Sequence, residues 1–242
     1  MAEPLPQLLK KAAELGSTNP QEAINQIELI NREYPEDAEA WHQTGLLCLN
    51  INQTEKAIQK LSQAALKNPK NALYQSNLGE LYRRQGMLDH SIRINKNAVK
   101  LKPDMVNANY NLAIAYYDNG GYNRAIKFYK KTVQLNPAHG MAWNNMGTCY
   151  ENKLDFDEAH LMYERAVKIN SGHLEALNNL ATTHNHKGDT DEAIKIFNQA
   201  IDLKPDFFEA HFNLSGLKTY TQDDPQLETL KQFTKSNKQF TQ

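Results

Sequence analysis

The 242-residue sequence lacks most features of secreted, membrane-bound or nucleic-acid-binding proteins. Its two cysteines, Cys48 and Cys149, are too few for a disulfide framework. No run approaches the roughly 18 consecutive apolar residues of a membrane span, and residues 1–11 lack the pattern of a secretion signal. The 27 Lys and Arg are balanced by 28 Asp and Glu, so the basic excess typical of nucleic-acid binding is missing. We therefore expect a cytoplasmic protein that binds neither membrane nor nucleic acid.

Motifs for catalysis and for cofactor binding are missing as well. The sequence has no glycine-rich phosphate loop, no nucleophile elbow and no zinc-ligand spacing. His184 and His186 lie two apart, so on a helix they would point roughly 200° from each other and could not share a metal ion. We expect no metal, no cofactor, no catalytic residue and no enzymatic activity.

A 34-residue period organises the chain, and its prolines expose it. When the proline is numbered as position 32 of each repeat, that position holds Pro35, Pro69, Pro103, Pro137, Ser171 and Pro205. Position 8 is always small, with Gly45, Gly79, Ala113, Gly147, Ala181 and Ser215. Position 20 is also always small, with Ala23, Ala57, Ser91, Ala125, Ala159 and Ala193. Such columns indicate one structural unit repeated along the chain.

The columns predict two antiparallel helices in each repeat. Positions 4, 7, 8 and 11 share one face of a first helix, and positions 20, 24 and 27 share one face of a second helix. Small residues at positions 8 and 20 allow the helices to approach closely, so Ala57, Ala125 and Ala159 should be buried. We expect the first helices to begin near Ala38, Ala72, Val106, Gly140, Leu174 and Phe208.

This pattern resembles the tetratricopeptide repeat family, whose signature combines the same columns. The resemblance implies an all-α fold, a right-handed superhelical solenoid of antiparallel helix pairs. It covers five full repeats in residues 38–206. A degenerate repeat precedes them at 1–37: its second half keeps the register, and residues 4–16 fit only after a slip of about one residue. A half repeat with a terminal helix and tail follows at 207–242. Because this scaffold serves many partners, it indicates protein–protein interaction without naming the partner.

A column of asparagines lies on the side of the first helix away from its core face. Positions 2, 5, 6, 9, 12 and 13 centre roughly 150° from the core positions, so they should line the concave groove of a solenoid. Position 6 holds Gln43, Asn77, Asn111, Asn145, Asn179 and Asn213. A primary amide offers donors and an acceptor that match a peptide backbone. The repeats of O-linked N-acetylglucosamine transferases carry a similar column, which implies peptide binding; the alternative is that the amides only support helix packing.

Other groove positions supply further candidate peptide-binding residues: Arg83, Tyr110, Tyr117, Asn144, Asn178, Thr148 and Thr182. Tyr110 and Tyr117 lie seven residues apart on one expected helix, as an anchoring pair or as cover for neighbouring apolar surface. If the groove amides are exposed, they should contribute little to folding.

Two functions are consistent with these features. The first is a scaffold whose Asn-lined groove binds extended segments of partner proteins. The second is the repeat arm of a larger transferase, because residues 211–230 resemble the junction that leads to the catalytic domain in bacterial tetratricopeptide sulfotransferases. That family's glycine- and arginine-rich donor loop does not occur before Gln242. The sequence leaves the partner and the oligomeric state open.

Overall fold

The structure is a computed structural model that describes residues 3–219 and 226–231, and within these ranges it consists of helices and loops with no strand. It divides into two compact units, the N-terminal unit (Met1–Gly121) and the C-terminal unit (Tyr122–Gln242). The N-terminal unit contains α1 (Leu5–Thr18), α2 (Pro20–Glu33), α3 (Ala38–Asn50), α4 (Thr54–Lys67), α5 (Ala72–Arg84), α6 (Leu88–Leu101) and α7 (Val106–Asp118). The C-terminal unit contains α8 (Tyr122–Leu135), α9 (Gly140–Asn152), α10 (Phe156–Ile169), α11 (Leu174–His186), α12 (Thr190–Leu203) and α13 (Phe208–Ser215).

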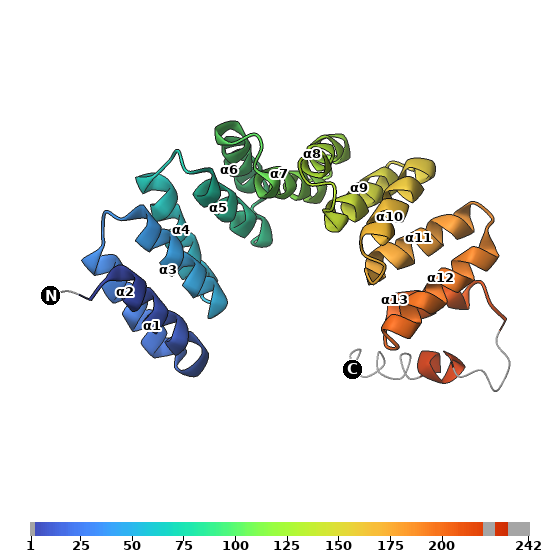
Figure 1. Ribbon diagram of the computed structural model, residues 1–242, viewed down its shortest axis with the longest axis horizontal. Coiled ribbons are helices and arrows are strands. Elements are labelled where there is room, and N and C mark those ends of the chain that lie inside the picture. The colour runs from blue at the N-terminus through green and yellow to red at the C-terminus, as the bar shows by residue number, and fades with distance from the viewer. Residues whose placement is uncertain (1–2, 220–225, 232–242) are drawn as a thin grey trace. The chain divides into compact units, whose positions relative to one another are not determined.

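Within each unit, consecutive helices pack as the hairpins α1–α2, α3–α4, α5–α6, α9–α10 and α11–α12, and neighbouring hairpins of one unit contact each other (Figure 1). The six first helices α3, α5, α7, α9, α11 and α13 begin at the residues expected from the 34-residue period. Ala57, Ala125 and Ala159 are completely buried, as their column predicts. The all-α repeat fold and its register are therefore confirmed. The predicted tail falls largely on residues 220–225 and 232–242, which lie outside the described residues.

The small residues of position 8 face the side chain at position 24 of the same hairpin. A Cβ atom added to Gly147 would lie 2.6 Å from the ring of Tyr163, and one added to Gly79 would lie 2.5 Å from the amide of Asn95. These distances are too short for ordinary van der Waals contact. Glycine at these positions is therefore what allows the two helices of a hairpin to pack together.

The five turns that follow α3, α5, α7, α9 and α11 use a left-handed backbone conformation at position 15. Positive φ angles occur at Asn52, Gly86, Gly120, Leu154 and Gly188. Glycine adopts this conformation without steric cost, whereas a residue with a Cβ atom is strained in it. Leu154, with φ of 62° and an exposed side chain, therefore stores local strain in the α9–α10 turn.

The backbone carbonyl of the proline at position 32 accepts a hydrogen bond from the first helix that follows it in the chain. The side chain at position 4 donates a hydrogen bond to the carbonyl oxygen of the preceding position 32 in the pairs Trp41–Pro35, Gln75–Pro69, Asn109–Pro103 and Trp143–Pro137. His211 contacts Pro205 in the same way, at 2.9 Å. Where Ser171 replaces proline, position 4 is Leu177, which has no polar group. These bonds satisfy the carbonyl of a loop residue two positions beyond the end of the second helix.

Two polar residues occupy columns that are otherwise apolar. Thr44 accepts a hydrogen bond from Asn31 Nδ2 at 3.0 Å and donates to the carbonyl of Ala40 at 2.8 Å, so its burial is compensated. Asn95 is fully buried and donates to Ser91 Oγ at 3.3 Å, but its Oδ1 atom has no hydrogen-bond partner among the described residues. A buried acceptor without a partner weakens the fold.

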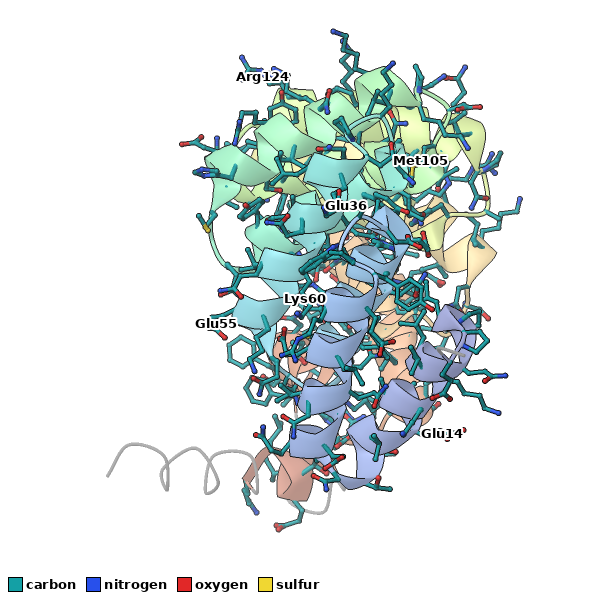
Figure 2. All side chains as sticks on the ribbon, turned by 90° about the vertical axis from the view of Figure 1, so that its left-hand side faces the viewer. Glu14, Glu36, Glu55, Lys60, Met105 and Arg124 are labelled. Atoms are coloured by element: carbon teal, nitrogen blue, oxygen red, sulfur yellow. The ribbon has the colours of Figure 1, made fainter. Side chains whose placement is uncertain are left out.

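A buried lysine joins three helices of the N-terminal unit. Lys60, labelled in Figure 2, extends from α4 and is only 4% exposed. Its Nζ atom lies 3.0 Å from the carboxylate of Glu28 on α2 and 5.4 Å from the centre of the Trp41 ring on α3. The carboxylate and the ring face both compensate the buried charge.

Candidate functional site

The candidate site is the first-helix face, which we define as the side of the first helices formed by positions 6, 9, 12 and 13. The five predicted asparagines of position 6 lie on it, on five consecutive first helices, and each is half-buried. They are Asn77 on α5, Asn111 on α7, Asn145 on α9, Asn179 on α11 and Asn213 on α13.

The position-6 amides bond to position 5 of the preceding repeat. Within the two units these contacts are Asn77–His42 at 2.9 Å, Asn111–Ser76 at 3.0 Å, Asn179–Asn144 at 3.2 Å and Asn213–Asn178 at 2.9 Å. In each pair, the asparagine Nδ2 group contacts the polar atom of its partner. The column therefore links neighbouring first helices, as the packing alternative requires.

These contacts change the role expected for position 5. Asn144, His42 and Ser76 are buried rather than open to a groove, because they lie between successive first helices. Burial lowers the pKa of His42, although the carboxylate of Glu39 partly opposes this shift, and the neutral ring can accept a hydrogen bond from Asn77. Sequence reasoning missed this pairing, although the signal was present as a polar position 5 next to each of these asparagines.

The same contacts leave part of each amide available. For Asn77, Asn111, Asn179 and Asn213, the bond to position 5 uses only the Nδ2 group, and the described residues provide the Oδ1 atom with no partner. One side of the amide is thus anchored in the stack, and its acceptor borders the first-helix face. An anchored amide presents its oxygen in a fixed orientation.

In the N-terminal unit, this face contains a small pocket between α3, α5 and α7. Leu46 and Leu49 of α3 line one side, Asn77 and Arg84 of α5 line another, and Asn111 of α7 completes it. Its volume of about 180 Å³ is below the roughly 300–1,000 Å³ of sites for small molecules. The pocket has the size of a side chain rather than of a cofactor.

Charged residues border this pocket. Arg83 donates from Nε and Nη2 to Glu80 at 2.8 and 3.0 Å, and from Nη1 to Asp118 at 2.6 Å. The Nε group of Arg84 also donates to Glu80, at 2.8 Å. Burial alone would raise the pKa of Glu80, but the hydrogen bonds from Arg83 and Arg84 outweigh it and hold that pKa below its usual range. Arg83, a predicted peptide-binding residue, is thus engaged by carboxylates of its own chain.

The C-terminal unit presents a polar version of the same face. Thr148 and Thr182, both predicted peptide-binding residues, occupy position 9 and are half-buried. Each hydroxyl donates to the carbonyl oxygen four residues earlier in its own helix, Asn144 at 3.3 Å and Asn178 at 2.9 Å. Tyr163 from α10 donates to Glu151 at 2.7 Å beside Thr148. Threonines here replace the leucine of the N-terminal pocket.

Tyr110 and Tyr117, the predicted anchoring pair, lie half-buried on α7.

No group of three or more His, Cys, Asp or Glu side chains is arranged to hold a metal ion in residues 3–219 and 226–231. Cys48 and Cys149 are buried free thiols, and burial raises the pKa of Cys149 to about 12. In the part of the chain that the structure describes, no helix is both long and apolar enough to cross a bilayer.

Repeated hairpins with small residues at positions 8 and 20 define a helical-repeat protein. Residues 104–172 and 151–217 each match a family model described as tetratricopeptide repeat. Over residues 104–217, the chain therefore matches tetratricopeptide repeats. A search among proteins of curated function found no significant match.

Solved structures share this fold. PilF of Pseudomonas aeruginosa superposes with a TM-score of 0.71 at 16% identity, covering 88% of this chain and 99% of that chain. YrrB, described as a tetratricopeptide protein with an unusual peptide-binding site, gives a TM-score of 0.63 at 21% identity over 78% of this chain and 97% of its own. MamA from Desulfovibrio magneticus gives 0.64 at 18% identity over 71% and 97% of the two chains. At these identities the likeness shows the fold alone.

Proposed function

We propose that this protein is an interaction scaffold that binds extended segments of partner proteins along the first-helix face. The single observation that carries the proposal is the column of anchored amides, in which Asn77, Asn111, Asn179 and Asn213 are held through Nδ2 by the preceding repeat. Asn77 and Asn111 line one open pocket, and amide oxygens can accept hydrogen bonds from backbone N–H groups of a bound chain. Such contacts hold a backbone without selecting its sequence.

The anchoring bonds favour this function energetically. A side chain that is already fixed loses little conformational entropy on binding, so a larger share of each hydrogen bond contributes to affinity. One neutral hydrogen bond contributes about 0.5–1.5 kcal/mol. Several such bonds along one bound segment together contribute several kcal/mol to the binding free energy. YrrB, which shares the fold, is described as having a peptide-binding site, and this supports the same use here.

Peptide binding can be tested by selecting ligands from a random peptide library with the full chain as bait. We expect Asn111→Ala to raise the Kd of a selected peptide about 2- to 10-fold. Asn97→Ala, on the exposed surface of α6, should leave that Kd unchanged. Because Asn111 also bonds to Ser76, the unfolding free energy must be measured on both variants. A loss of stability with unchanged binding per folded molecule would show that the amides serve only the stack.

A second candidate function is the repeat arm of a larger transferase of the sulfotransferase or glycosyltransferase type. It is favoured by the resemblance of residues 211–230 to a sulfotransferase junction, of which residues 220–225 lie outside the described residues. The test is the gene sequence beyond the codon for Gln242. A following glycine- and arginine-rich loop would support this function, and a stop codon there would exclude it.

A further inference from the structure

The N-terminal pocket differs chemically from the rest of the first-helix face. Three leucines contribute an apolar part of its lining, Leu46 and Leu49 of α3 and Leu81 of α5, next to Asn77 and Asn111. Leu46 and Leu49 are both only half-buried. Burying apolar surface that is still open to water stabilises a complex by about 25 cal/mol per Å². The pocket therefore favours an apolar side chain over a polar one.

The exposed charge beside the pocket has one sign. Glu80 uses both carboxylate oxygens on Arg83 and Arg84, and Asp118 is bound by Arg83. The side chains of Glu80, Asp118 and Arg83 are only 21%, 28% and 23% exposed, whereas that of Arg84 is 64% exposed. Arg84 bonds to Glu80 through Nε, and the described residues provide its two Nη groups with no partner. The accessible donor at the rim is thus a guanidinium.

We propose that this pocket binds an aliphatic side chain of the partner segment, and that Arg84 pairs with an acidic side chain next to it. This rests on the proposed function, because the amides of Asn77 and Asn111 hold the segment's backbone on either side. In an extended chain, alternate residues point the same way. The acidic residue therefore lies two positions before or after the aliphatic one. The volume of the pocket, about 180 Å³, suits a single side chain.

The experiment is a random peptide selection followed by binding measurements. We expect the selected pool to be enriched in Leu, Ile or Met with Asp or Glu two residues away. For one selected peptide, replacing the aliphatic residue by Ala should weaken binding about 10-fold. Leu46→Thr should have a similar effect, whereas Leu66→Thr, a leucine on α4 that is 71% exposed and outside the pocket, should have none.

The acidic contact is tested by a double-mutant cycle. Arg84→Gln and a peptide with Asn in place of its acidic residue should each weaken binding about 2- to 5-fold, and the two changes together should cost no more than one of them. Arg84 is exposed, so this variant keeps the pocket folded even if Leu46→Thr does not. Independent effects of the two changes would overturn the pairing.

The outcomes separate this inference from the proposed function. If Asn111→Ala weakens binding while Leu46→Thr and Arg84→Gln leave it unchanged, the first-helix face binds peptides and the pocket assignment is wrong. If no variant of the first-helix face weakens binding, the proposed function itself is wrong. A selection that returns no peptide above background would overturn both.

Discussion

The first-helix faces of the two units share one column and differ in another. In both units, a position-6 asparagine bonds to position 5 of the preceding repeat, as Asn111 does to Ser76 and Asn179 to Asn144. At position 9, the N-terminal unit offers Leu46 beside a pocket, while the C-terminal unit offers a threonine such as Thr182 bonded to its own helix. The comparison shows that one column links neighbouring first helices, while the residues at position 9 differ in chemistry between the two units.

The hairpin interiors of the two units differ at position 24. In the N-terminal unit, Gly79 packs against the polar Asn95, while in the C-terminal unit Gly147 packs against the ring of Tyr163. In both hairpins, a glycine at position 8 faces the side chain at position 24. Substitutions at positions 8 and 24 should therefore change the stability of one unit without changing that of the other.

The largest effect is expected from Gly147→Ala. The new Cβ atom would lie within 2.6–3.0 Å of three ring carbons of Tyr163, and this ring is fully buried and its hydroxyl is bonded to Glu151. We expect a loss of about 1–3 kcal/mol in unfolding free energy from overpacking. Hydrogen exchange should become faster in the C-terminal unit and remain unchanged in α1–α4.

The matched control for this prediction is Gly172→Ala. Its Cβ atom would meet only Asn170 Oδ1, at 3.5 Å, so the unfolding free energy should change by no more than about 0.5 kcal/mol. Equal effects of the two substitutions would contradict the close packing of α9 on α10.

The sequence predicted the fold well because its strongest signals are local and repeated. The small residues at Gly45 and Ala57 recur with one period, and that period places every first helix. The site was predicted only in part. The partner of Asn179 lies 35 residues away, on the preceding first helix. A helical wheel assigns a direction to one side chain but does not reveal what the neighbouring repeat places there, so Asn144 was assigned to the groove although it is buried.

The next largest effect should come from Asn179→Ala. It removes the hydrogen bond to Asn144, and because Asn144 is buried its oxygen loses a partner that water does not replace. We expect the unfolding free energy to fall by about 1–2 kcal/mol. This differs from the sequence-based expectation that groove amides contribute little to folding. Chemical denaturation of Asn179→Ala beside Asn97→Ala, an exposed asparagine on α6, would measure it, and equal midpoints would contradict the structural role of the column.

A stabilising change is expected in the N-terminal unit from Asn95→Leu. The substitution removes a buried oxygen without a hydrogen-bond partner, and Leu61 already occupies the equivalent position opposite Gly45 in the preceding hairpin. We expect a gain of about 1 kcal/mol. A higher thermal midpoint, with faster exchange nowhere in α5 or α6, would confirm it. A loss of stability would show that the bond from Asn95 to Ser91 matters more than the unsatisfied oxygen.

Leu154→Gly should give a smaller gain. Leu154 adopts a φ of 62°, which costs a residue with a Cβ atom about 1–2 kcal/mol relative to glycine. The greater flexibility of glycine in the unfolded chain offsets about 0.5–1 kcal/mol of this strain. The net gain should thus be about 0.5 kcal/mol. The reverse change, Gly188→Leu, introduces the same strain into the α11–α12 turn and should lower the thermal midpoint; a midpoint that rises would contradict the argument.

The smallest effect we expect is that of mild acid, and it should fall more heavily on the C-terminal unit. Burial lowers the pKa of His42 in the N-terminal unit and of His139 and His160 in the C-terminal unit. A ring nitrogen of His42 contacts Asn77, one of His139 accepts from the backbone amide of Ala142, and one of His160 contacts Thr183. Because an unfolded histidine binds its proton near pH 6.5, stability is fully present above about that pH and is lost as the pH falls toward the lower folded-state pKa values. Between about pH 7 and pH 6 these histidines titrate only partly, so the loss of unfolding free energy begins small.

Denaturation series at several pH values should show a shallower pH dependence of the unfolding free energy for His160→Gln than for the unmodified protein. Parallel curves would contradict the assignment.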